Sequence, residues 1–168
     1  MFDIVDLPDR ATLAKVAERY PDMDIPALET WLTLMSVSDD CMDDLDQFLA
    51  GHNLSQRKFF VLILLMRNPG GLKVSQLAEG TSVSCPTMTG VVDGLLNAGL
   101  VTRETDEQDR RVFVVGITPA GQELLDQVMP EHYRRINRIM VCLDSGERTQ
   151  LKIILTKVRA GLEAARNV

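Results

Sequence analysis

Two adjacent arginines, Arg110 and Arg111, are the residues whose type and spacing most clearly favour binding chemistry. They lie between a carboxylate-rich segment that ends at Asp109 and an alternating apolar run over residues 112–117. A guanidinium group that projects from a turn can bind phosphate, and arginine fits the narrow, electronegative minor groove of DNA. Asp109 and Arg111 are two residues apart, so we expect them to pair and leave Arg110 free for a ligand. A solvated turn with surface charges and no ligand is the alternative interpretation.

The charge of the chain is spread unevenly, although its net value is −6. Residues 1–50 hold 12 Asp and Glu against 3 Lys and Arg, whereas residues 51–118 hold 6 against 7 and residues 119–168 hold 6 against 8. The acidity therefore belongs to the first third. The overall charge does not exclude a nucleic acid as the partner of the middle segment.

The residues that could bind a metal or catalyse a reaction are few and widely spaced. The cysteines are Cys41, Cys85 and Cys142, and the histidines are His52 and His132; none lies in a CxxC, HExxH or nucleophile motif. We therefore expect no metal, no cofactor and no enzyme. No apolar run approaches the roughly 18 residues of a membrane span, and the acidic start is not a secretory signal. We expect a soluble, cytoplasmic protein with no membrane partner.

Hydrophobic spacing and capping residues predict mostly helices, with one hairpin that carries the arginine pair. Pro130 falls inside one predicted helix and should kink it. Helices are expected at residues 9–20, 26–49, 55–66, 74–79, 84–97, 119–143 and 144–162, and strands at 100–104 and 112–117.

The predicted helix at 84–97 has an exposed face that is almost bare. Pro86, Gly90 and Gly94 recur every four residues and form a strip without long side chains. Each helical glycine costs roughly 1 kcal/mol relative to alanine, so close approach to the major groove of DNA would explain the strip. Close packing against another protein helix is the alternative. Hydroxyl groups for phosphates and bases are expected from Ser84, Thr87 and Thr89.

The order helix, helix, helix-turn-helix, hairpin, long helix, long helix resembles the multiple-antibiotic-resistance regulator (MarR) family of transcription factors over roughly residues 27–165. The hairpin segment 109–121 matches the family pattern of Asp, any residue and Arg, followed by a strand that ends in Val-x-Leu/Ile-Thr-x-x-Gly. Residues 77–101 give a second match.

The resemblance implies a mainly α fold with a small β-hairpin wing, namely a winged helix-turn-helix flanked by N- and C-terminal dimerisation helices. The expected parts are an N-terminal extension with a short helix at 1–24, a dimerisation region at 25–54 and 119–168, and a DNA-binding lobe at 55–118. The expected partners are double-stranded DNA and a second copy of the chain. The expected DNA-binding residues are Ser84, Pro86, Thr87, Thr89, Gly90, Arg103, Asp109, Arg110 and Arg111.

The charge of the predicted recognition helix leaves a second function open. Its exposed face has no Lys or Arg and carries Asp93, whereas many family members have a basic residue at the position of Gly94. Phosphate affinity would then depend on basic residues elsewhere, namely Arg57, Lys58, Arg67, Lys73, Arg103, Arg110 and Arg111. A winged-helix protein-interaction module with little DNA affinity is the alternative function.

The family also implies a small aromatic or amphipathic effector that releases a repressor from a pseudo-palindromic operator. The expected effector-binding residues are Trp31, Met35, Phe59, Ile63 and Met66, and plain core packing is the alternative for this stripe. Redox sensing by cysteine is a further alternative, although helical spacing places Cys85 toward a buried flank. His132 is expected to be a core histidine.

Overall fold

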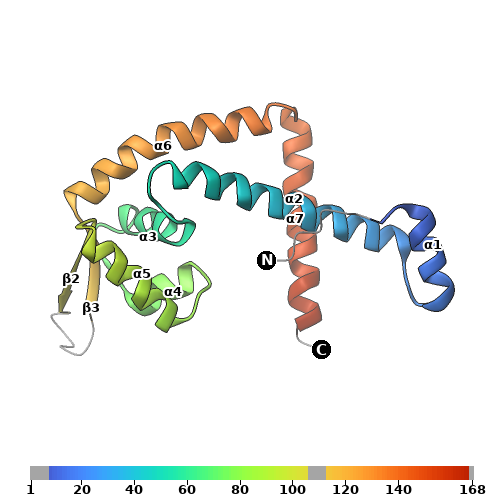
Figure 1. Ribbon diagram of the computed structural model, residues 1–168, viewed down its shortest axis with the longest axis horizontal. Helices are drawn as coiled ribbons and strands as arrows, with labels where there is room; N and C mark the ends of the chain where they lie inside the picture. The colour runs from blue at the N-terminus through green and yellow to red at the C-terminus, as the bar shows by residue number, and fades with distance from the viewer. Residues whose placement is uncertain (1–7, 106–112, 167–168) are drawn as a thin grey trace. The chain divides into compact units, whose positions relative to one another are not determined.

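The computed structural model describes residues 8–105 and 113–166, which form a mainly helical chain with one small antiparallel sheet (Figure 1). This confirms the predicted fold class. The elements in chain order are α1 (Arg10–Arg19), α2 (Ile25–Ala50), α3 (Gln56–Met66), β1 (Leu72–Lys73), α4 (Val74–Gly80), α5 (Cys85–Asn97), β2 (Val101–Thr105), β3 (Phe113–Ile117), α6 (Pro119–Met140) and α7 (Ser145–Arg166).

The chain divides into two compact units, Met1–Gln122 and Glu123–Val168. The first unit holds α1 to α5 and the sheet, and the second holds most of α6 and all of α7. Among the described residues, no helix is both long enough and apolar enough to cross a bilayer.

The predicted helices begin where their capping residues place them. Ser55 and Ser84 accept hydrogen bonds from the backbone N–H groups of Lys58 and Thr87, each at 3.4 Å. Asp9 and Asp24 cap α1 and α2 in the same way. Such side chains satisfy N–H groups that have no partner inside the helix, and the local sequence therefore sets these boundaries.

The sheet contains one strand more than the sequence predicted. The strand order is β1-β3-β2, and both pairs are antiparallel. β1 has only two residues, too few to show an alternating pattern. Gly71 leads into it at φ +77°, and a Cβ there would lie 2.6 Å from the Val114 side chain. Glycine is therefore required for the chain to reach the edge of β3.

The core of the first unit is built around α3, as its apolar sequence predicted. Phe59, Val61, Leu62 and Leu65 are all fully buried. Buried side chains from the other elements of this unit surround the helix. They include Leu49, Leu77, Met88, Val92, Leu95, Val101 and Val115.

The loop before α6 joins the wing to the helix-turn-helix. The Thr118 hydroxyl donates to the Gly99 carbonyl at 2.8 Å and accepts from the Gly121 N–H at 3.0 Å. The Thr118 N–H donates to the Leu100 carbonyl at 3.1 Å. A Cβ at Gly121 would overlap that carbonyl oxygen and lie 2.9 Å from the Ile117 side chain. This overlap explains the Thr-x-x-Gly pattern at the end of the wing motif.

Gly121→Ala is expected to lower the free energy of unfolding by about 1–3 kcal/mol, because the added methyl group must displace backbone. Gly161→Ala is the matched control, since a Cβ at Gly161 meets nothing within 4 Å. Its better helix propensity should leave stability unchanged or raise it by up to about 1 kcal/mol. Urea unfolding followed by circular dichroism measures both. Equal stability of the two variants would contradict the role of Gly121.

The second unit exposes most of its apolar residues. α6 continues past Pro130 to Met140 without ending at the proline. α7 begins with the predicted capping box, in which Asp144 and Glu147 exchange two hydrogen bonds of 2.8 Å. No residue of α7 is buried. Its exposed apolar residues include Leu151, Ile153, Ile154, Leu155 and Leu162.

Candidate DNA interface

The helix-turn-helix is formed by α4 and α5, which lie side by side in Figure 1. Ser82 makes the turn at φ +55°, and the Val83 N–H donates to the Ala78 carbonyl at 3.0 Å. Met88, Val92 and Leu95 fix one side of α5 in the core. The opposite side of α5 is left exposed.

Three hydroxyl groups lie at the exposed start of α5, on Ser84, Thr87 and Thr89. The Ser84 and Thr87 hydroxyls share one hydrogen bond of 2.8 Å, so one of the two O–H groups remains free to donate. The Thr89 hydroxyl donates to the Cys85 carbonyl at 3.0 Å, which leaves its oxygen free to accept. These three residues are exposed, and so are Pro86 and Gly90.

The two glycines of the α5 strip have different surroundings. A Cβ at Gly90 would meet nothing within 4 Å. Within the described part of this unit, packing against another helix therefore does not account for Gly90. A Cβ at Gly94, in contrast, would lie 3.2 Å from Lys58 Cε and 3.4 Å from Lys58 Nζ. The end of the Lys58 side chain thus lies against Gly94, a contact that sequence reasoning missed.

Arg103 of β2 connects the wing to α5. Its guanidinium group lies 3.5 Å from the Asp93 carboxylate and 4.1 Å from the centre of the Phe113 ring. The carboxylate is about half exposed, so this ion pair contributes little to stability, about 0–1 kcal/mol. The pair places a positive charge from β2 beside the acidic residue of α5. The sequence identified Arg103 and Asp93 but did not predict their pairing.

The predicted arginine pair lies outside the described residues. Asp109, Arg110 and Arg111 all fall in the segment that joins β2 to β3. The described ends of this segment are Thr105 and Phe113, which are partners in the sheet register. The predicted pairing of Asp109 with Arg111 stays a prediction.

The predicted effector residues lie on two helices of the first unit. Trp31 and Met35 belong to α2, where Trp31 is 42% exposed and Met35 is half-buried. Phe59, Ile63 and Met66 belong to α3, where Phe59 is fully buried and the other two are half-buried. Phe59 is therefore a core residue of this unit, and the effector role of all five stays a prediction.

The prediction that Cys85 lies toward a buried flank is wrong, because the structure has this cysteine exposed. Cys85 is the first residue of α5, and the first turn of this helix reaches beyond the core residues that start at Met88. His132 of α6 is half-buried. Burial, followed by the positive charge of Arg135, lowers the pKa of His132 and favours its neutral form.

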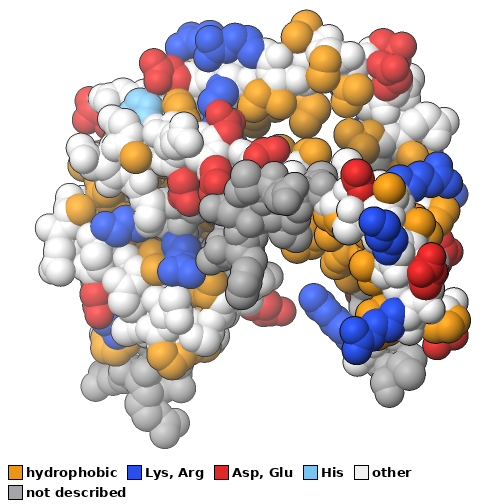
Figure 2. All heavy atoms as spheres, turned by 45° about the vertical axis from the view of Figure 1, so that its right-hand side comes forward, with side chains coloured by type: hydrophobic (Ala, Val, Ile, Leu, Met, Phe, Trp, Pro, Cys, Tyr) orange, Lys and Arg blue, Asp and Glu red, His pale blue; other side chains and the backbone are white. Residues whose placement is uncertain are grey.

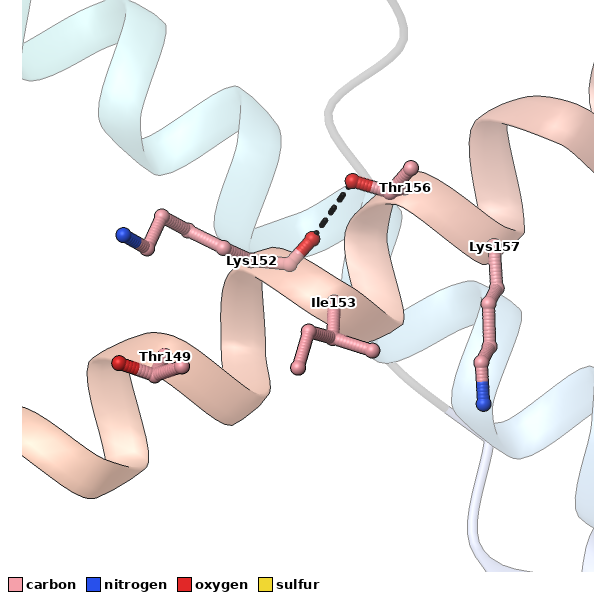
Figure 3. A pocket seen from close by; sticks show the side chains of 5 residues that line it. All are labelled: Thr149, Lys152, Ile153, Thr156 and Lys157. Carbon is pink, nitrogen blue, oxygen red and sulfur yellow. Dashed lines mark hydrogen bonds between the residues drawn. The ribbon is translucent and has the colours of Figure 1, made fainter.

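Apolar side chains lie open at the surface, interspersed with basic and acidic ones (Figure 2). On α7 a shallow pocket is lined by Thr149, Lys152, Ile153, Thr156 and Lys157 (Figure 3). The two lysine side chains point away from each other, and Ile153 lies between them. The Thr156 hydroxyl donates to the Lys152 carbonyl at 2.8 Å.

Comparison with known proteins identifies the class to which this fold belongs. The model of the MarR family matches residues 54–113. The transcriptional repressor YetL of Bacillus subtilis (strain 168) is 31% identical over 139 residues, which cover 82% of this chain and 83% of YetL. The regulator PecS of Dickeya dadantii (strain 3937) is 30% identical over 144 residues, which cover 84% of this chain and 87% of PecS. The chain belongs to the MarR family, whose members are transcriptional regulators.

Solved structures share the fold. AbsC, a MarR family transcriptional regulator from Streptomyces coelicolor, has a TM-score of 0.77 at 24% identity. The match covers 84% of this chain and 97% of AbsC. The MepR–DNA complex of S. aureus has a TM-score of 0.69 at 22% identity, and the match covers 78% of this chain and 94% of MepR. CouR from Rhodococcus jostii RHA1, bound to p-coumaroyl-CoA, has a TM-score of 0.67 at 22% identity, and the match covers 77% of this chain and 90% of CouR.

Proposed function

We propose that the chain is a homodimeric repressor that binds a pseudo-palindromic DNA duplex and is released by a small aromatic or amphipathic effector. In this function α5 enters the major groove, and the wing with Arg110 reaches the adjacent minor groove. Ser84, Pro86, Thr87, Thr89, Gly90, Arg103, Asp109 and Arg111 complete the proposed interface. The repressor would act in the cytoplasm, and no step requires catalysis.

The exposed strip of α5 is the observation that carries this proposal. Gly90 lies inside α5 and costs roughly 1 kcal/mol of helix stability relative to alanine, yet no described side chain occupies the space that it leaves. A helix backbone that approaches base edges and phosphates uses such a space. The free hydroxyl at Ser84 and Thr87 lies at the start of the same helix.

The exposed apolar side of α7 supports a dimer. Leu151, Ile154, Leu155 and Leu162 recur at helical spacing and are 38%, 53%, 42% and 40% exposed. Burying apolar surface contributes about 25 cal/mol per Å², so a second copy of this helix would stabilise both chains. A twofold dimer would place two α5 helices about 34 Å apart, one turn of DNA. We therefore group residues 25–54 and 119–168 as the dimerisation region and residues 55–118 as the DNA-binding lobe, with residues 1–24 as an extension.

The effector proposal draws on CouR, whose structure holds p-coumaroyl-CoA, and on NadR, whose structure holds the aromatic carboxylate 4-hydroxyphenylacetate. Trp31 is the single tryptophan of the chain, so its fluorescence reports on one place. We expect a bound aromatic carboxylate to change the emission of Trp31 and to release DNA over the same range of concentrations. Titration of the protein–DNA complex with a panel of aromatic carboxylates checks this expectation. Release of DNA without any change in emission would exclude Trp31 from the effector site.

Fluorescence anisotropy on DNA from upstream of the protein's own gene, with scrambled DNA beside it, tests the proposed function. We expect tighter binding to the upstream DNA and a steep fall of affinity with salt, because basic residues displace counterions from phosphates. Equal and weak binding to both duplexes would contradict the repressor and favour a winged-helix module that binds another protein.

A further inference from the structure

The Lys58 ammonium group lies on the recognition helix although its backbone belongs to α3. Lys58 is the third residue of α3, and the end of its side chain lies against Gly94 in the last turns of α5. Gly94, which is half-buried, follows the exposed Gly90 by one turn, and the space beside Gly90 is open. The lysine therefore adds a positive charge to a strip that has no Lys or Arg of its own.

Local electrostatics does not explain why lysine occupies this place. The first turn of α3 contains Arg57 and Lys58 and no acidic residue. Positive charge near a helix N-terminus opposes the helix dipole and is therefore unfavourable. Among the described residues, no carboxylate forms an ion pair with Lys58, and Asp93 is engaged by Arg103. A phosphate group would supply the missing negative charge.

Gly94 is the residue that makes this arrangement possible. A Cβ at 3.2 Å from Lys58 Cε is closer than ordinary van der Waals contact, so a side chain at position 94 would move the lysine. The glycine thus serves a different purpose from Gly90, which leaves open space. Gly94 leaves room for the end of the Lys58 side chain beside the α5 backbone.

We propose that Lys58, laid across Gly94, binds a phosphate group of the DNA backbone beside the groove that α5 enters. This inference rests on the proposed DNA-binding function and assigns to it a contact from outside the helix-turn-helix. The contact is to the backbone, so it raises affinity for every duplex and carries no sequence preference.

The test is the salt dependence of DNA affinity for four proteins: wild type, Lys58→Met, Lys58→Met with Gly94→Lys, and Lys15→Met. Methionine keeps the aliphatic stem and removes the charge. Lys15 is exposed on α1, which lies at the opposite end of α2 from α3 (Figure 1). Thermal unfolding shows whether each variant folds, and Lys58→Met should be at least as stable as wild type, because it removes an unfavourable charge.

For Lys58→Met we expect roughly tenfold weaker binding to upstream and scrambled DNA alike. The slope of log affinity against log salt should become shallower by about 1.8 for a dimer, or 0.9 for each lysine. The double variant should recover the wild-type slope, and Lys15→Met should retain it. An unchanged slope in Lys58→Met, or no recovery in the double variant, would overturn the Lys58 contact alone. Absence of DNA binding by the wild type would overturn the proposed function as well.

Discussion

Gly90→Leu is expected to weaken DNA binding by about 100-fold or more, roughly 3 kcal/mol of binding free energy. The physical reason is steric, because the leucine side chain would fill the open space that the proposed interface assigns to DNA. The same space means that leucine meets no protein atom near its Cβ. Leucine also favours helix over glycine by roughly 1 kcal/mol, so the variant should unfold at the wild-type temperature or above it.

Gly90→Ala is the matched control for this variant. It brings the same gain in helix propensity but adds one methyl group, so its DNA affinity should fall far less than that of Gly90→Leu. Anisotropy measures affinity, and thermal unfolding by circular dichroism measures stability. Wild-type affinity in a folded Gly90→Leu protein would show that this side of α5 does not approach DNA.

Ile154→Glu is expected to convert the dimer to a monomer and, as a consequence, to reduce DNA binding sharply. Ile154 is 53% exposed in the single chain, so glutamate at this position does not disturb the fold of one copy. In a dimer the same side chain would be buried, and an unpaired carboxylate there costs several kcal/mol. Multi-angle light scattering should then give the 18.7 kDa of one chain instead of twice that mass.

Thr149→Glu provides the control for Ile154→Glu, because it adds the same charge to α7 on a different side of the helix. We expect this variant to remain dimeric and to bind DNA. A monomeric wild type, or an Ile154→Glu protein that stays dimeric, would contradict the assignment of this apolar stripe to a dimer contact.

The features that the sequence predicted depend on residues close together in the chain. Ser55, Ser84 and the Asp144–Glu147 pair act over three residues, so the starts of α3, α5 and α7 could be identified without tertiary information. The buried character of α3 followed from its own apolar run. The pattern of two strands around a polar loop predicted β2 and β3, with β2 beginning one residue later than expected.

The features that the sequence did not predict are contacts between distant elements. Lys58 and Gly94 are 36 positions apart, and no local pattern indicates that the end of the Lys58 side chain would lie against Gly94. Arg103 meets Asp93 only because β2 folds back beside α5. β1 exists because Gly71 brings a two-residue segment to the edge of β3, and such a segment has no periodicity to detect.

In the proposed complex, two copies of α5 enter the major groove on one face of a duplex. Hydroxyl-radical footprinting on a duplex selected from a random library tests this arrangement. We predict two protected patches, related by twofold symmetry and separated by about one helical turn, roughly 10 base pairs. A single unsymmetrical patch, or no duplex enriched above the starting library, would contradict it.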